Sequence, residues 1–137
     1  LSKLSVRPWL CAGDYNEILH SYEKEEITPR PNEQIEEICN CLEHYELQDM
    51  GFRGFPVTWC NDSEIPQTVE ARLDRACCNS RWAAIFPVAR VLHGQVAVLD
   101  HLLVWVDLEP LTDYNQKKRP RPFTLKQLGQ RIKSVLR

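Results

Sequence analysis

The sequence predicts one layered domain of the α/β or α+β class, in which strands and helices alternate. Three observations support this class. The chain has 137 residues, which allows one domain and leaves little room for a second. Hydrophobic residues make up 43% of the chain and charged residues 26%, a composition typical of a folded, soluble protein. Short apolar runs bounded by turn residues alternate with helical periodicity, as in a layered sheet.

The first elements are a strand, a loop and a helix. Residues 9–12 form an apolar run before Gly13, which predicts a buried strand ending in a turn. Residues 17–31 are polar and without a sustained period, which predicts a loop or a short helical turn. Asn32 is the predicted N-cap of a helix to about Tyr45. Its apolar face consists of Ile35, Ile38, Cys39, Leu42 and Tyr45.

The remaining elements are short strands and one short helix. Strands are predicted over residues 47–50, 56–59, 69–77, 88–92 and 102–108. The last is dense enough in apolar side chains to be a central strand buried on both faces. Ser80 is the predicted N-cap of a helix that ends at Ile85, before Pro87.

The charges divide the chain into a body, residues 1–116, and a basic arm, residues 117–137. The net charge is −2, but the arm carries eight basic and no acidic residues, which leaves 9 basic and 19 acidic residues in the body. A basic arm can bind nucleic-acid phosphate with salt-sensitive affinity, and a solvated tail is the alternative. The arm is also predicted to contain a short amphipathic helix, whose apolar residues are Leu125, Leu128, Ile132 and Leu136.

No membrane partner is expected, because the apolar run 102–106 is far shorter than the ~20 residues that a bilayer helix needs. The six cysteines are predicted to be reduced thiols. Cys77 and Cys78 are adjacent and cannot easily bridge each other, and the cysteine spacing does not match paired zinc ligands.

Asp14 and Asn16 follow the first predicted strand. If that strand continued, both side chains would project to one face. A carboxylate with an amide can hold a water molecule near a phosphate. The alternative is a turn, since Gly13, Asp14 and Asn16 are all turn formers.

Asp100 and His101 interrupt the otherwise apolar stretch 96–106, and charged groups are rare in buried strands unless they are paired or bind metal. A carboxylate suits Mg²⁺ or Mn²⁺, and the imidazole could contact a phosphate or protonate a leaving group, with Asp74 orienting its other nitrogen. These groups are what metal-assisted phosphodiester hydrolysis needs. Alternatively, Asp100 caps a turn and His101 is a structural, half-buried histidine.

Several separate motifs occur in order along residues 8–109. They are Pro-Trp-Leu-Cys-Ala-Gly-Asp-Tyr-Asn-Glu-Ile-Leu at 8–19, Glu-Lys at 23–24, Pro-Arg-Pro at 29–31, the segment 54–61 with Thr58-Trp59, Arg-Leu-Asp-Arg at 72–75, Trp82 with Phe86-Pro87, and Asp100-His101. In this order and spacing they resemble the endonuclease/exonuclease/phosphatase superfamily. The likeness is closest to the apurinic-type endonuclease domain of plant non-LTR retrotransposons.

The resemblance implies the C-terminal half of a four-layer α/β sandwich of the DNase I-like type, acting on DNA with Mg²⁺, or with Mn²⁺ as the alternative ion. By the same resemblance, Asp14 would orient or deprotonate the attacking water, and Asn16 would hold that water or the phosphate. Asp100 would help bind the metal. His101 would contact the scissile phosphate, and Asp74 would polarise His101.

The resemblance also assigns three residues to positions near the DNA: Arg72, Thr58 and Trp59. For Trp59, packing in the core is the favoured alternative, since tryptophan is so often largely buried.

The N-terminal half of the family's domain, with its metal-binding glutamate, has no counterpart, and Leu99 replaces the usual serine. The expected function is therefore a fragment or degenerate copy of the endonuclease, inactive alone, whose uncovered sheet face favours self-association. The alternative is a non-catalytic nucleic-acid-binding module that uses the basic arm. The family and the basic cluster at 117–121 imply a nuclear location.

Overall fold

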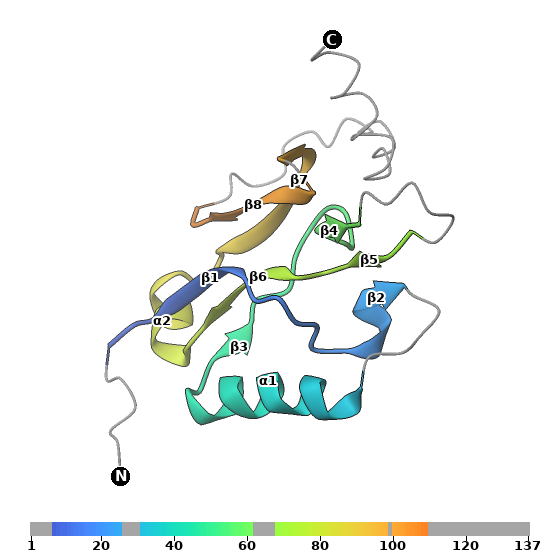
Figure 1. The fold of residues 1–137 in the computed structure, drawn as a ribbon. Coiled ribbons are helices and arrows are strands. Elements are labelled where there is room, and N and C mark those ends of the chain that lie inside the picture. Colours follow the sequence, from blue (N-terminus) through green and yellow to red (C-terminus); the bar gives the residue numbers. More distant parts are fainter. Residues whose placement is uncertain (1–6, 26–30, 62–67, 99, 110–137) are drawn as a thin grey trace.

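The structure is a computed structural model that describes residues 7–25, 31–61, 68–98 and 100–109 (Figure 1). The helices are α1 (Asn32–His44) and α2 (Ser80–Ile85), with a 3-10 turn, η1 (Ser21–Glu23). The strands are β1 (Leu10–Asp14), β2 (Lys24–Glu25), β3 (Gln48–Asp49), β4 (Trp59–Cys60), β5 (Glu70–Ala71), β6 (Asp74–Cys78), β7 (Arg90–Val98) and β8 (His101–Asp107). This mixture of helices and strands is of the general α/β class expected.

The strands form two antiparallel sheets. One has the order β1-β6-β3 and the other the order β2-β5-β4-β8-β7. The longest pairing is the hairpin of β7 and β8, whose register shifts between His93 and Ala97. Asp100 lies in the turn of that hairpin and His101 begins β8, which explains how two polar residues fit between apolar strands.

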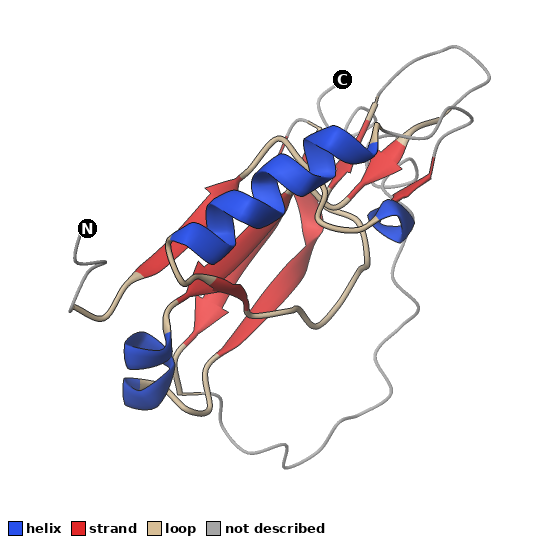
Figure 2. Ribbon diagram, turned by 90° about the horizontal axis from the view of Figure 1, so that it is seen from below, coloured by secondary structure: helices blue, strands red, loops and turns tan. Residues whose placement is uncertain are grey.

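The helix α1 lies along one face of the three-stranded sheet (Figures 1 and 2). Its Leu42 belongs to a buried cluster with Leu19, Leu47 and Cys77 of β6. Because side chains alternate along a strand, Asp74 of β6 points to the opposite face from Cys77. There it meets His101 of β8, so the two sheets are in contact at these residues.

The prediction of one continuous strand over residues 69–77 is wrong. The segment contains two strands in different sheets, because β5 ends at Ala71 and β6 begins at Asp74. Between them the main chain bonds to new partners: the Arg72 N–H donates to the Glu23 carbonyl, and the Leu73 carbonyl accepts from the Tyr15 N–H, both at 2.9 Å. Asp74 therefore lies where the chain passes from one sheet to the other.

Several element boundaries also differ from the predictions. The strand predicted over residues 56–59 is the shorter β4, which includes only Trp59 of that range. The N-cap of α1 is Pro31, and Asn32 is its first residue. The N-cap of α2 is Asn79, whose side chain accepts from the Trp82 N–H, and not Ser80. The strand predicted to end at residue 92 continues to Val98 as β7. The short strand β2 lies in the segment predicted to be a loop.

The expectation that residues 102–108 are buried on both faces is wrong. Leu102 is 4% exposed, but Leu103 and Trp105 are 52% and 45% exposed. Among the described residues, the face of β8 that carries Leu103 and Trp105 is thus partly open to solvent, although His101 on the same face meets Asp74.

The domain boundary at residue 116 and the helix predicted in the basic arm lie outside the described residues. Within the described part of the chain, no helix is both long and apolar enough to cross a membrane. All six cysteines are free thiols, as the sequence predicts.

Candidate functional site

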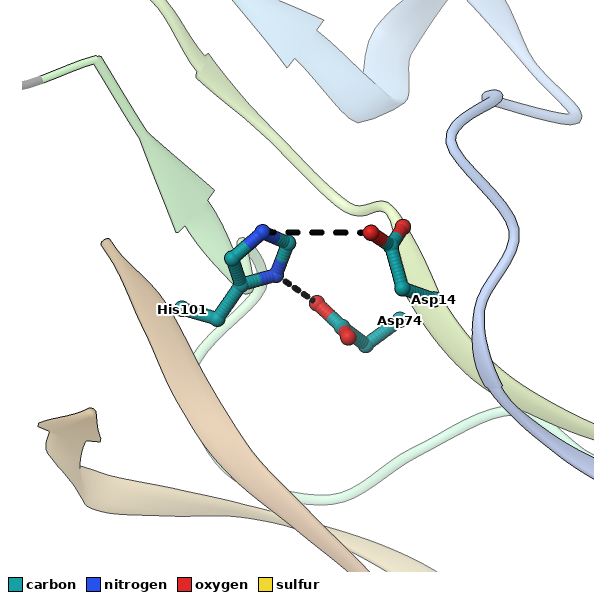
Figure 3. A group of neighbouring side chains, drawn as sticks. All are labelled: Asp14, Asp74 and His101. Carbon is teal, nitrogen blue, oxygen red and sulfur yellow. Dashed lines mark hydrogen bonds and ion pairs between the residues drawn. The ribbon is translucent and has the colours of Figure 1, made fainter. Parts of the chain in front are cut away.

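His101 is the centre of a polar cluster at the contact between the sheets (Figure 3). Its Nδ1 lies 2.8 Å from Oδ2 of Asp74. Its Nε2 lies 3.9 Å from Oδ2 of Asp14 and 3.9 Å from Oδ1 of Asp100. The structure therefore brings four of the predicted site residues together, from β1, β6, β8 and the turn before β8.

The three carboxylates determine the charge of the imidazole. Partial burial of His101 favours its neutral form, but the hydrogen bond and charge of Asp74, followed by the charges of Asp14 and Asp100, outweigh that effect. The pKa of His101 is raised above its ordinary value of 6.5 as a result. The raised pKa keeps the imidazole protonated to a higher pH than that of an ordinary histidine, which suits contact with an anion.

Asp14 and Asn16 form a turn and do not continue the strand. Asp14 is the last residue of β1, and Asn16 has a left-handed φ of 54°. The Asn16 N–H donates to Oδ1 of Asp14 at 2.8 Å, as in an Asx turn. This bond leaves the other carboxylate oxygen, Oδ2, directed toward His101 (Figure 3).

Asp100 is fixed by an aromatic neighbour. Nε1 of Trp59 donates to Oδ2 of Asp100 at 2.9 Å, and Trp59 pairs with His101 between β4 and β8. Trp59 is only partly buried and lines a cleft, so it is neither a full core residue nor a freely exposed one.

The structure does not place Thr58 and Arg72 where they can contact DNA. Thr58 is fully buried and Arg72 is 4% exposed. The Arg72 guanidinium donates to Glu23 at 3.0 Å and to both oxygens of Asp49 at 2.7 and 2.9 Å. It also lies 4.7 Å from the centroid of the Phe52 ring. All of these contacts are inside the fold, so the expectation that Arg72 and Thr58 face the substrate is wrong for this structure.

Arg75 joins the same buried ion-pair network, which the sequence did not predict. Its guanidinium, 0% exposed, lies 2.9 Å from Glu23 and 2.9 Å from Asp49. Burial alone would raise the pKa of both carboxyls, but the two arginines hold each pKa below its ordinary value. The network fixes residues 72–75, and with them Asp74. The only sequence signal for it is the arginine pair flanking Leu73-Asp74.

The cluster opens into a cleft of about 540 Å³. Its lining combines apolar and polar side chains, among them Ile18, Lys24, Trp59, Leu73, Asp100 and His101. Asn16 also lines this cleft, so the structure places it beside the cluster. A second cleft of about 440 Å³, lined by β1 and β8, also includes Asp74 and His101.

Asp14, Asp74 and His101 each offer an atom within 4.8 Å of the others, the spacing of a metal site. This trio as a whole does not suit Mg²⁺, which prefers oxygen, because one member is an imidazole and Asp74 already bonds to it. The oxygens that suit Mg²⁺ or Mn²⁺ are Oδ2 of Asp14 and Oδ1 of Asp100, both 3.9 Å from Nε2 of His101. A hard ion needs one or two such carboxylates, completed by water and phosphate oxygens. The carboxylate of Asp14 or that of Asp100 therefore offers one ligand of the kind that such an ion uses.

Comparison with known proteins finds no family model that matches the chain. No curated protein and no solved structure matches it either.

Proposed function

We propose that this chain is a fragment or degenerate copy of a Mg²⁺-dependent endonuclease of the endonuclease/exonuclease/phosphatase superfamily, with hydrolysis of DNA phosphodiesters as its ancestral reaction. The observation that carries the proposal is the convergence of Asp14, Asp74 and Asp100 on the two nitrogens of His101. The proposal includes the finer fold: the C-terminal half of a four-layer, DNase I-like sandwich. A DNA substrate also favours a nuclear location.

His101 is the group that contacts the scissile phosphate. Asp74 accepts a hydrogen bond from Nδ1 at 2.8 Å, which orients the ring and stabilises its charged form. Nε2 is then the nitrogen that donates to a phosphate oxygen. A phosphodiester carries a negative charge, and a charge-assisted hydrogen bond to it is about twice as strong as a neutral one.

Asp14 is the group that orients or deprotonates the attacking water. Its Oδ1 is occupied by the Asn16 N–H, so Oδ2 is the oxygen that accepts from water. Oδ2 of Asp14 and Nε2 of His101 are neighbours in the cluster, 3.9 Å apart. Water and phosphate would thus be bound side by side, which lowers the entropic cost of reaction.

Asp100 would help to hold the divalent ion. When bound, such an ion stabilises negative charge on the phosphate. The Trp59 indole holds the carboxylate of Asp100 in place through Oδ2. The cleft beside it, with Lys24 among its lining residues, is the surface that we assign to DNA.

The test uses the full chain with Mg²⁺ and a simple phosphodiester, dimethyl phosphate, followed by NMR of the histidine ring protons. We expect the His101 signals to shift on addition of the phosphodiester. His20 is exposed and stacks on Tyr22, so its signals serve as an internal control that stays unchanged. Asp14→Ala should weaken the response of His101. If the His101 ring-proton signals do not shift on addition of the phosphodiester, the proposal is contradicted.

Nicking of supercoiled plasmid in Mg²⁺ then measures activity. We expect no nicking above that of His101→Ala, because the family's N-terminal half has no counterpart in this sequence. Nicking that is lost in both Asp14→Ala and His101→Ala, and kept in His20→Ala, would show a working site and overturn the expected inactivity.

The second candidate function is non-catalytic binding of nucleic acid by the basic arm. The observation that favours it is the charge of the last 21 residues, which carry eight basic and no acidic residues. Replacing the basic residues of the cluster 117–121 by glutamine in the full chain should then weaken DNA binding and reduce its salt dependence. If the arm is a solvated tail, these replacements will leave DNA binding unchanged.

A further inference from the structure

Thr58 is a fully buried hydroxyl at the point where the two sheets meet. Its Oγ1 accepts two hydrogen bonds from the crossover between β5 and β6. The donors are the N–H groups of Leu73, at 3.0 Å, and Asp74, at 2.9 Å. One side-chain oxygen therefore holds the two main-chain N–H groups that flank the Cα of Leu73.

The main chain of Thr58 holds the other partner of the site. Its carbonyl accepts from the Leu102 N–H at 2.7 Å, directly after His101. Its own N–H donates to the carbonyl of Ala71 at 3.0 Å. Thr58 is thus bonded both to the segment that carries Asp74 and to the strand that carries His101.

These bonds matter because the crossover leaves the regular ladder of the five-stranded sheet. A buried N–H that has no acceptor costs about 1–3 kcal/mol. Asp74 and His101 also belong to different sheets, so their 2.8 Å bond depends on how the sheets are placed relative to each other. Thr58 is bonded on both sides of that contact.

We propose that Thr58 is a positioning residue that sets the Asp74 carboxylate against the His101 imidazole, with its hydroxyl acting on one partner and its carbonyl on the other. Thr58 does not touch the substrate, because it is fully buried. The catalytic meaning of this role rests on the proposed function, but the geometric role does not.

Two substitutions separate the hydroxyl from the rest of the side chain. Thr58→Val keeps the β-branched shape and the main-chain bonds but removes the acceptor of the Leu73 and Asp74 N–H groups. Thr58→Ser keeps the hydroxyl and removes only the methyl group. If the hydroxyl positions Asp74, the valine variant should lose the Asp74–His101 bond and the serine variant should keep it.

The experiment is NMR of the full chain without metal or DNA. The first readout is hydrogen exchange of the Leu73 and Asp74 amides, which should become faster by about tenfold in Thr58→Val. The second is the hydrogen-bonded Nδ1–H signal of His101, which should be lost in Thr58→Val and present in Thr58→Ser. His93 provides the internal control, because its Nδ1 lies 2.6 Å from the Phe55 carbonyl and its signal should persist in both variants.

A valine variant that keeps the His101 Nδ1–H signal would overturn the proposal. So would a serine variant that loses it, since the hydroxyl would then be present without effect; this second result decides the question even if the valine variant does not fold. Neither outcome depends on DNA cleavage, so failure of the endonuclease proposal and failure of this one are distinguishable.

Discussion

Asp14 and Asp74 lie directly opposite each other at the end of the antiparallel pair formed by β1 and β6. Two like charges in opposed positions destabilise a sheet. The imidazole of His101, from the other sheet, offsets this repulsion, since it bonds to Asp74 and lies 3.9 Å from Asp14. The same contact therefore joins the sheets and raises the pKa of the histidine.

Asp74→Asn should lower the pKa of His101. The substitution removes the carboxylate that makes the 2.8 Å bond and contributes most to the upward shift, while burial continues to favour the neutral ring. The measurement is an NMR titration of the His101 ring protons. Asp107→Asn is the matched control, because Asp107 lies at the far end of β8 and pairs with Arg90. An unchanged His101 midpoint in Asp74→Asn would contradict this account of the shift.

His101 should also make stability depend on pH. Its pKa in the folded state is above the ordinary value of 6.5, so its contribution to stability is fully present below 6.5 and is lost as the pH rises through the folded pKa. We expect the free energy of unfolding of the wild type, relative to that of His101→Gln, to fall over this window. Taking the difference cancels the opposite titration of buried His93, whose pKa is lowered. Denaturant unfolding across the window checks this, and a constant difference would refute it.

The buried network predicts a large loss of stability for Arg75→Ala. Glu23 is 6% exposed and Asp49 is partly buried. The change removes one of the two arginines that pair with each of these carboxylates. Breaking a buried ion pair in this way costs about 3–5 kcal/mol. The control is Arg90→Ala, whose 3.6 Å pair with Asp107 is more exposed and should cost less than about 1 kcal/mol. Urea unfolding measures both losses of stability. Equal losses in the two variants would show that the buried network contributes no more to stability than the exposed ion pair does.

The elements that depend on local pattern could be predicted from the sequence, and those that depend on distant partners could not. The apolar period of α1 and the run in β1 predicted both elements within one or two residues. The split between β5 and β6 was missed because the rough alternation over residues 69–77 was interpreted as one strand. The apolar positions change phase between Leu73 and Ala76, which is the local signal for the crossover, but the new pairing partners lie far away in the chain.

In the site too, contacts between residues far apart in the sequence could not be predicted. The grouping of Asp14, Asp74 and His101 was expected from the resemblance, and the structure brings these three residues together. Arg72 was expected to face DNA from the same resemblance. The residues that bury its charge, Glu23 and Asp49, are 49 and 23 positions away in sequence. Burial of a charge by such distant residues cannot be inferred from the motif alone.

The exposed apolar side chains on the His101 face of β8 predict concentration-dependent self-association of the chain. Leu103 and Trp105 are 52% and 45% exposed, and they lie two residues apart on one face of the strand. Contiguous exposed apolar side chains of this kind favour contact with another molecule. Leu103→Lys should therefore shift the chain toward the monomer in sedimentation velocity. Val88→Lys is the control, since Val88 is 62% exposed but lies outside the strands. A chain that sediments as a monomer at every concentration, or a Leu103→Lys variant that associates as the wild type does, would show that this face is not an interface.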